Sequence, residues 1–159
     1  NRTIDDTHGD SVTHTMVEYT NHWNVGPTCT GCKVQPDRLQ AYEQTWHDTT
    51  TDSPNTTAIH SATLKFNGIG SSGTAVWIYC ILVNSGKPFV TIATNTTFEV
   101  DGAPAGEYKH TPNKTNEQYL YNVSVFSRTD MSMEEHVLVM SAMQGSAPSL
   151  LLFDYAVYT

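Results

Sequence analysis

The feature that most constrains the fold is the stretch TAVWIYCILV, Thr74–Val83, which is almost continuously apolar. An apolar run of this kind is typical of a central β-strand that is covered on both faces. The rest of the chain must therefore supply a layer on each side of this strand. Thr, Ser and Asn dominate the neutral polar residues, and these favour strands and turns over helices.

Further strand patterns occur along the whole chain. In IHSATLKFNG (residues 59–68), Ala62, Leu64 and Phe66 share one face, and the stretch ends in the turn former Asn67-Gly68. The other predicted strands are FVTIAT (89–94), TFEVDG (97–102), GEYKHT (106–111), YLYNVSVF (119–126), HVLVMSAM (136–143) and SLLLFDYAVYT (149–159). Helical signal is limited to single turns in PDRLQAYEQ (36–44) and MSMEEH (131–136). The pattern predicts one all-β domain over residues 1–159, a jelly-roll-like β-sandwich.

The charge balance excludes several classes of partner. The 159 residues include 8 Lys and Arg against 16 Asp and Glu, a formal net charge of −8. Nucleic acids and anionic membrane surfaces need a basic footprint, which this composition does not offer. No run approaches the roughly 18 apolar residues of a spanning helix. Neutral ligands, cations and glycans remain as candidates.

Five N-glycosylation sequons point to an extracellular protein. They lie at Asn1, Asn55, Asn95, Asn113 and Asn122. Strand alternation places Asn95 and Asn122 on solvent faces, where a glycan can be attached. A start at Asn1 without a signal peptide fits a trimmed mature domain. We therefore expect a secreted or surface protein, with membrane tethering through a segment outside this chain as an option; chance sequons in a cytosolic protein are the alternative.

The three cysteines suggest one small disulfide. Cys29 and Cys32 form CTGC among Gly, Pro and Thr. A redox motif of this type would open a helix, and no helical pattern follows here. A zinc site would need a second pair of cysteines, which the sequence lacks. A structural disulfide that closes this loop is the preferred interpretation, with Cys80 as a buried free thiol. The alternative pairs Cys80 with Cys29 or Cys32.

Several motifs resemble a known group of proteins. The stretches RTIDDTHGD, CTGC, PD, TWHD and LLLFDYAVY extend from Arg2 to Tyr158 and are similar to those of basidiomycete surface proteins. PDRLQAYEQTWHDTT also resembles a segment of galactose-binding-like β-sandwiches, in which an aromatic residue is followed by Asp-Gly and then Trp. This chain has Glu43-Gln44 in place of Asp-Gly and so lacks the glycine of that tight turn. The resemblance implies a galactose-binding-like sandwich, a fold that in carbohydrate-binding modules binds glycans.

The stretch QTWHDTT contains the first candidate ligand site. Trp46 would stack on a sugar ring while His47 and Asp48 hydrogen-bond its hydroxyls. In the alternative, Trp46 packs beneath the loop as a plug, as the resemblance implies for the corresponding Trp, and the two polar residues tie loop backbone. Alternation places Trp46 and Asp48 on one side and His47 on the other, so the three converge only if the segment is a loop.

The stretch VEYTNHWNVGPT contains the second candidate. Trp23 and Tyr19 lie in a loop rich in Gly, Pro and Asn, and His22 and Asn24 flank Trp23 with polar groups. The alternative is that Trp23 packs on the CTGC loop. A binding role requires Trp23 or Trp46 to be exposed, whereas a purely structural role buries both.

Acidic residues near the two ends of the chain form a candidate calcium site. Asp5, Asp6 and Asp10 precede a turn, and Asp154 lies in an apolar strand where it needs a metal, an arginine such as Arg2 or a backbone donor. A structural Ca²⁺ held by Asp5, Asp6 and Asp154 is one interpretation. Turn and cap hydrogen bonds are the other.

The sequence offers little support for catalysis. It has no G-x-S-x-G elbow and no HExxH spacing, although a distant pair of glycosidase carboxylates needs no local motif. We expect a non-catalytic module that binds a glycan or cell-wall polysaccharide. The alternatives are a structural or adhesion ectodomain and, third, an enzyme acting on wall polysaccharide.

Overall fold

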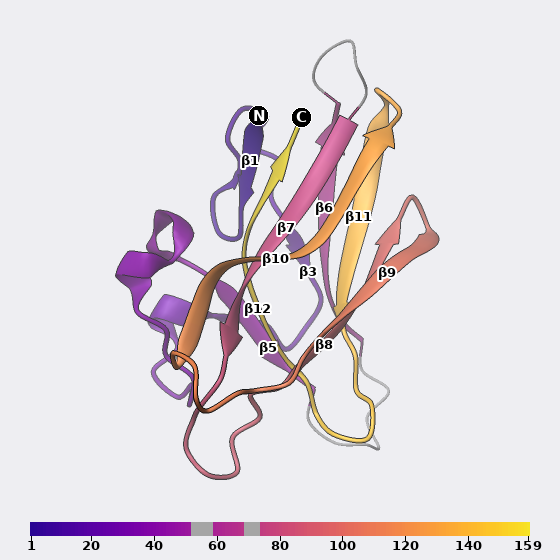
Figure 1. Ribbon diagram of the computed structural model, residues 1–159. Coiled ribbons are helices and arrows are strands. Elements are labelled where there is room, and N and C mark those ends of the chain that lie inside the picture. The colour runs from indigo at the N-terminus through magenta and orange to yellow at the C-terminus, as the bar shows by residue number, and fades with distance from the viewer. Residues whose placement is uncertain (52–58, 69–73) are drawn as a thin grey trace.

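The protein is a sandwich of two antiparallel β-sheets. The computed structural model describes residues 1–51, 59–68 and 74–159, so the sequon at Asn55 lies outside the described residues. Figure 1 shows the two layers, with the N- and C-termini close together at one end. The predicted all-β fold is confirmed. No helix in the described part of the chain has the length and apolar character needed to span a membrane.

The first sheet has the order β10-β7-β12-β1-β2, and β5 also pairs with β12 and carries β4. The predicted strand over Thr74–Val83 is β7, and it lies between two partners as expected of a central strand. The other strands of this sheet are β1 (Arg2–Asp5), β2 (Gly9–Asp10), β4 (Asn24–Val25), β5 (His47–Thr50), β10 (Tyr119–Met131) and β12 (Leu150–Tyr158).

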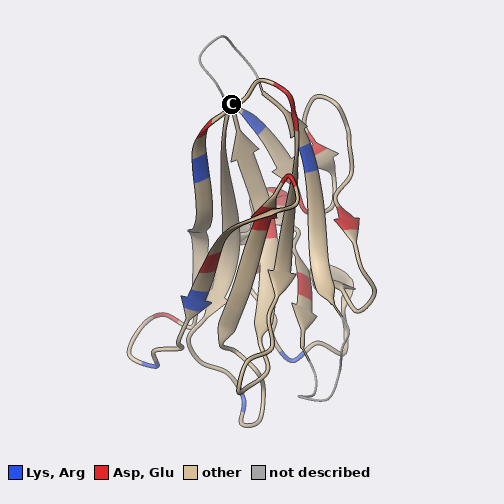
Figure 2. Ribbon diagram, turned by 90° about the vertical axis from the view of Figure 1, so that its right-hand side faces the viewer, with Lys and Arg blue, Asp and Glu red and all other residues tan. Residues whose placement is uncertain are grey.

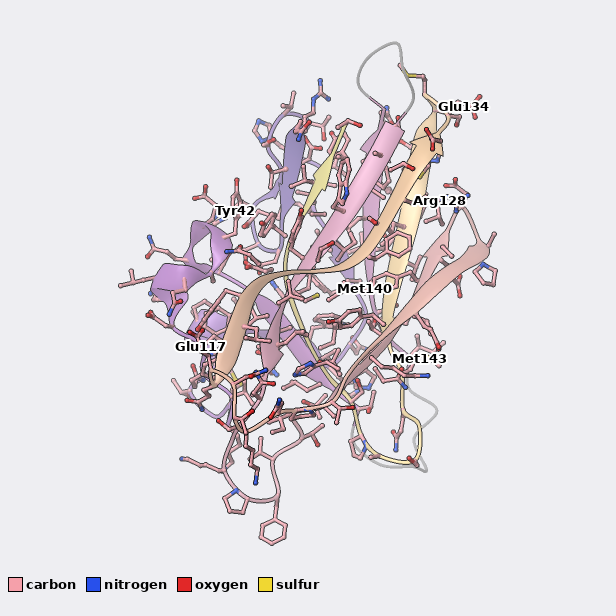
Figure 3. The ribbon with its side chains drawn as sticks, in the orientation of Figure 1. Tyr42, Glu117, Arg128, Glu134, Met140 and Met143 are labelled. Atoms are coloured by element: carbon pink, nitrogen blue, oxygen red, sulfur yellow. A yellow bond between two sulfur atoms is a disulfide. The ribbon has the colours of Figure 1, made fainter. Side chains whose placement is uncertain are left out.

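The second sheet has the order β3-β6-β11-β8-β9. Its strands are β3 (Glu18–Tyr19), β6 (His60–Asn67), β8 (Thr94–Val100), β9 (Ala103–His110) and β11 (Glu135–Ala142). Ala62, Leu64 and Phe66 of β6 all face the core, as their alternation predicts. Met140 of β11 is fully buried between the sheets (Figure 3).

Among the residues that the structure describes, buried apolar side chains form two clusters. The main one fills the space between the sheets and includes Cys80, which is a buried free thiol as predicted. The second lies on the outer side of the first sheet, where Trp46 packs with Ile81, Val83 and Leu152. The segment between β3 and β5 covers this second cluster, and that segment also supplies part of the candidate site.

Short helices occur only in the segment between β4 and β5 among the described residues. They are 3-10 helices at Gly26–Thr28, Arg38–Gln40 and Tyr42–Gln44, so the predicted turns within residues 36–44 are confirmed. Asp37 caps the second of them by accepting the Leu39 N–H. Glu43 and Gln44 have φ of +47° and +63°, so the tight turn forms without its glycine.

Two local predictions were wrong. The stretch MSMEEH makes no helix; β10 ends at Met131 and β11 begins at Glu135, which leaves only a hairpin turn. The stretch FVTIAT is not a strand, because residues 84–93 form the loop between β7 and β8 and β8 begins only at Thr94. That loop borders a cleft of about 740 Å³.

Candidate functional site

A cleft of about 740 Å³ opens between two loops. One wall is the loop at residues 29–34 and the other is the loop at residues 87–91. The floor consists of Asn24, Asp48, Thr50 and Leu150. We call this hollow the Phe89 cleft, after the most exposed residue that borders it. Its floor is rigid, because β5 pairs with both β4 and β12.

Phe89 is held in an unfavourable conformation. The Val90 N–H donates to the Lys87 carbonyl (3.3 Å) and closes a four-residue turn with Pro88 second and Phe89 third. Phe89 has φ of +63°, a value that favours Gly or Asn at this position of a turn. The conformation costs roughly 1–2 kcal/mol in a non-glycine residue. The ring is also fully exposed, at 107%. The ring is therefore accessible for a contact outside the chain.

The facing wall is held by the predicted disulfide, which is confirmed between Cys29 and Cys32. The Gln35 side chain donates to the backbone carbonyls of Cys29 (2.8 Å) and Cys32 (3.3 Å) and closes the loop further. Lys33 on this wall and Lys87 on the other are both exposed. The rim of the cleft therefore carries two of the eight basic residues of an acidic protein. Figure 2 shows the Lys and Arg residues scattered singly over the strands and loops.

Two predicted ligand residues meet at the floor of the cleft. Asn24 of β4 faces Asp48 of β5, and its Nδ2 donates to Asp48 Oδ1 (3.0 Å). Asp48 is 6% exposed, and its Oδ2 is buried without a hydrogen-bond partner. Burial raises the pKa of Asp48, against the opposing effect of the Asn24 hydrogen bond. The pair offers an amide and a carboxyl group directly below the Phe89 turn.

Trp46 is not a ligand platform, which corrects its place among the candidates. Its side chain is 1% exposed and packs with the second apolar cluster. The Gly26 N–H donates to the Trp46 carbonyl (2.9 Å), and a Cβ at Gly26 would overlap the indole ring. The interpretation of Trp46 as a plug is therefore correct, and the glycine lets the covering turn approach it.

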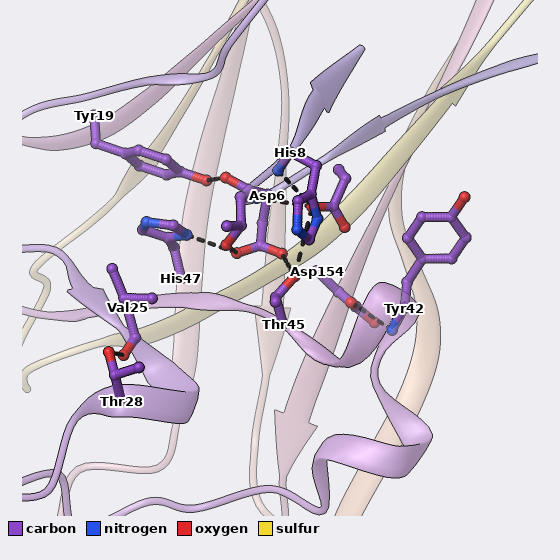
Figure 4. Close-up of polar contacts among 11 residues, drawn as sticks. Asp6, His8, Tyr19, Val25, Thr28, Tyr42, Thr45, His47 and Asp154 are labelled. Carbon is purple, nitrogen blue, oxygen red and sulfur yellow. Dashed lines mark hydrogen bonds and ion pairs between the residues drawn. The ribbon is translucent and has the colours of Figure 1, made fainter. Parts of the chain in front are cut away.

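His47 faces away from the cleft, because it alternates with Trp46 and Asp48 as predicted. Its Nδ1 contacts Asp6 Oδ2 (2.6 Å), and its ring stacks on Tyr19 with centroids 4.2 Å apart (Figure 4). The Tyr19 hydroxyl donates to the Asp6 carbonyl (2.8 Å). His47 thus ties the β1–β2 turn to β5 and does not share a site with Asp48.

Trp23 and His22 are also separated from the cleft. Trp23 is half-buried and packs against the main core and Tyr19, with ring centroids 4.9 Å apart. His22 is exposed and stacks on His60, with centroids 5.3 Å apart. Of the six predicted ligand residues, only Asn24 and Asp48 line the cleft.

The acidic residues near the chain ends lie close together, but they use their oxygens differently. Asp6 accepts bonds from Thr45 Oγ1 (2.6 Å) and Thr7 Oγ1 (2.8 Å) in addition to its contact with His47. Both oxygens of Asp6 therefore have hydrogen-bond partners. Asp10 accepts turn amides and the Tyr158 hydroxyl.

Asp5 and Asp154 differ from Asp6, because each has a free oxygen. Asp154 Oδ1 accepts the Tyr42 N–H (2.9 Å; Figure 4), and Asp5 Oδ1 accepts the amides of Thr7 and His8. Oδ2 of both residues is buried without a partner. Burial raises the pKa of Asp154 to about 7, and the charges of Asp6 and Asp5 contribute. No group of three or more His, Cys, Asp or Glu side chains in the described ranges is placed to hold a metal ion.

The sequon asparagines that the structure describes are accessible to different degrees. Asn1, Asn113 and Asn122 are exposed, and Asn95 is half-buried on the outward face of β8. Asn113 Oδ1 accepts both the N–H and the hydroxyl of Thr115, the third residue of its own sequon. Asn95 and Asn122 therefore both lie on the outside of the protein as expected, but a bulge between Leu120 and Val123 interrupts the strand alternation at Asn122.

The sequence matches no protein-family model and no curated protein. Solved structures with the same fold were found. The CBM35 module from Paenibacillus barcinonensis has a TM-score of 0.56 at 12% identity, over 100% of this chain and 98% of the module. A family 35 carbohydrate-binding module from Clostridium thermocellum has a TM-score of 0.52 at 10% identity, over 89% and 90% of the two chains.

A third similar structure is an exo-β-1,3-galactanase from Phanerochaete chrysosporium, solved with β-1,3-galactotriose. Its TM-score is 0.53 at 11% identity, over 99% of this chain and 28% of the enzyme. At these identities the likeness establishes the fold. The chain thus has the jelly-roll β-sandwich fold of carbohydrate-binding modules.

Proposed function

We propose that this chain is a non-catalytic glycan-binding domain and that its ligand occupies the Phe89 cleft. The observation that carries the proposal is Phe89 itself, a fully exposed aromatic ring in a left-handed turn conformation at the rim of the cleft. An exposed aromatic face with polar groups beside it is suited to the apolar side of a sugar ring and to its hydroxyls. The shared fold with carbohydrate-binding modules supports the same reading.

Each group at the cleft has a role in this proposal. Phe89 stacks on the sugar ring, and the Asn24–Asp48 pair hydrogen-bonds sugar hydroxyls after a small movement that opens access to Asp48 Oδ2. Lys33 and Lys87 contact ligand oxygens from opposite walls. The disulfide fixes the wall that faces Phe89, which lowers the conformational entropy lost on binding.

The cleft has too few carboxyl groups for glycoside hydrolysis by the common route. Glycoside hydrolysis by the common route needs two carboxyl groups, about 5–9.5 Å apart, on either side of the bond that is cleaved. Asp48 is the only acidic residue among the described residues that line the cleft. A ligand bound there meets one carboxyl group, so the cleft can hold a glycan without cleaving it.

We further propose an extracellular location, with a cell-wall polysaccharide of a fungal surface as the partner. The exposed sequon asparagines and the oxidised Cys29–Cys32 pair support this location. We also propose a structural Ca²⁺ at Asp5 and Asp154, whose buried Oδ2 atoms have no hydrogen-bond partner and could each serve as a ligand. Because Asp6 is engaged, backbone carbonyls and water would complete the oxygen ligands that Ca²⁺ prefers.

A glycan-array screen tests the function. The wild-type chain is compared with Phe89→Ala and with the matched control Leu39→Ala, which removes a side chain that is 77% exposed outside the cleft. We expect Phe89→Ala to weaken binding at least tenfold and Leu39→Ala to bind as wild type does. If the wild type binds no glycan, the function is wrong. If Phe89→Ala binds normally, the ligand lies elsewhere.

A further inference from the structure

A row of tyrosines covers part of the outer face of the first sheet. Tyr79 of β7 and Tyr155 of β12 stack with centroids 4.7 Å apart and ring planes 9° from parallel. Tyr42 packs against the other side of Tyr155, with centroids 4.6 Å apart. All three are half-buried, and Figure 3 shows Tyr42 on the outside of the sheet beside the 3-10 helices. We call these three residues the tyrosine stack; it lies apart from the residues that line the Phe89 cleft.

The sequon Asn122-Val123-Ser124 borders this stack. Ser124 of β10 is directly opposite Tyr79, and the Tyr155 hydroxyl donates to Asn122 Oδ1 (3.4 Å). Asn122 lies where the register of β10 shifts, between Leu120 and Val123, with φ of +55°. Asn tolerates this left-handed conformation better than most residues, and the bulge turns its side chain toward the stack.

We propose that Asn122 carries an N-glycan whose first sugar packs against Tyr79 and Tyr155. The Tyr155 hydrogen bond uses only Oδ1, so the amide nitrogen to which a glycan is joined is not consumed by it. The first sugar would then extend over neutral aromatic side chains and the exposed Ser124 hydroxyl. Such a sugar removes apolar tyrosine surface from water and stabilises the β10–β7–β12 part of the sheet. This inference rests on the proposed extracellular location and not on the Phe89 cleft.

Asn113 differs from Asn122 in its position. It lies in the loop between β9 and β10, and its Oδ1 is bonded to Thr115 of its own sequon. A glycan there would project from this loop and not from a strand beside the tyrosine stack. Asn113 therefore provides a control.

The test uses the chain made in a eukaryotic secretory pathway, with glycopeptide mass spectrometry for occupancy and thermal unfolding for stability. Ser124→Ala removes the sequon without changing Asn122. We expect Asn122 to be occupied and Ser124→Ala to lower Tm by about 2–4 °C, the shift expected for roughly 1 kcal/mol in a domain of this size. In bacterially produced protein, which lacks glycans, Ser124→Ala should leave Tm unchanged. Asn113→Gln should shift Tm by the same amount in the glycosylated and the bacterial protein, because its effect comes from the lost hydrogen bonds to Thr115 and not from a glycan contact.

Two further measurements locate the contact. In a Tyr79→Leu background, where Tyr155 remains, loss of the Asn122 glycan should lower Tm by less than it does in the wild type. In wild-type protein whose glycans are trimmed to one sugar per site, the ring currents of the tyrosines should move the NMR signals of the Asn122 sugar protons upfield. This measurement remains informative if Tyr79→Leu folds poorly. An empty Asn122 beside an occupied Asn113 would overturn this inference alone. Equal effects of Ser124→Ala with and without glycans, or unshifted sugar protons, would overturn the contact. None of these results affects the proposed glycan binding at the Phe89 cleft, which the glycan array tests separately.

Discussion

Asp154 is predicted to make the stability of the calcium-free protein fall as the pH rises. The side chain is fully buried, and its pKa rises from 3.8 to about 7 in the folded state. The folded protein therefore holds this proton more tightly than the unfolded chain does. Stability is lost progressively between pH 4 and pH 7, as the buried carboxyl is forced to ionise. At 1.36 kcal/mol per pKa unit, the whole loss is about 4 kcal/mol.

The substitution Asp154→Asn isolates this effect. An asparagine keeps an oxygen that can accept the Tyr42 N–H, but it cannot ionise. Asp48 and His136 also have shifted pKa values, and their contributions cancel in the difference between the two proteins. The difference does include the repulsion between Asp154 and Asp5, because the charge of Asp5 helps to raise the pKa of Asp154. With a chelator present, we expect the variant to be more stable than the wild type by a few kcal/mol at pH 8 and by much less at pH 4.

Urea unfolding at pH 4, 5, 6, 7 and 8, with and without Ca²⁺, measures this difference. Ca²⁺ should stabilise the wild type most at high pH, where Asp154 is ionised, and should have little effect on Asp154→Asn. A difference between the two chelated proteins that stays constant from pH 4 to pH 8 would refute the argument from burial. A wild type that gains no stability from Ca²⁺ at pH 8 would refute the proposed metal.

Two backbone substitutions test the segment that covers the second apolar cluster. Gly26→Ala should destabilise the protein by about 1–3 kcal/mol in urea unfolding, because the added methyl group overlaps the Trp46 ring. Gly31→Ala is the control, because a methyl group there meets open space. Equal stability of the two variants would contradict the tight packing of the Gly26 turn over Trp46. Gln44→Gly should stabilise the protein by up to about 1 kcal/mol, because glycine relieves the left-handed strain at φ of +63°. Gln44→Ala should give no gain in stability. A similar gain from alanine would show that backbone strain is not the cause.

The sequence was most informative where burial decides the structure. The run Thr74–Val83 predicted a central strand because apolar side chains on both faces of a strand have to be covered. In the structure Ile78 and Leu82 of β7 belong to the main core, and Ile81 and Val83 belong to the second apolar cluster on the opposite face. Strand alternation also separated His47 from Trp46 and Asp48. The disulfide and the buried Cys80 followed from their surroundings in the sequence.

The sequence predicted Asn24 and Asp48 of the candidate site but not Phe89, because the stretch that begins at Phe89 has the pattern of a strand. FVTIAT alternates as a half-buried strand would, but alternation cannot show whether a partner strand is available. The signal that would have corrected it is the preceding SGKP, in which Gly and Pro favour a turn and Pro pre-sets its second position. Trp23 and Trp46 were predicted to bind a sugar because an indole ring can stack on one, but both side chains pack against apolar clusters of the protein.

The Cys29–Cys32 loop links the chemistry of the surroundings to the shape of the cleft. The main core between the sheets does not include either cysteine, so reduction leaves most of the buried apolar surface in place. One wall of the Phe89 cleft, however, loses its covalent closure. We therefore expect protein made in a reducing cytosol to be folded and soluble but a poor measure of binding strength. Recombinant material for affinity work should be matured under oxidising conditions.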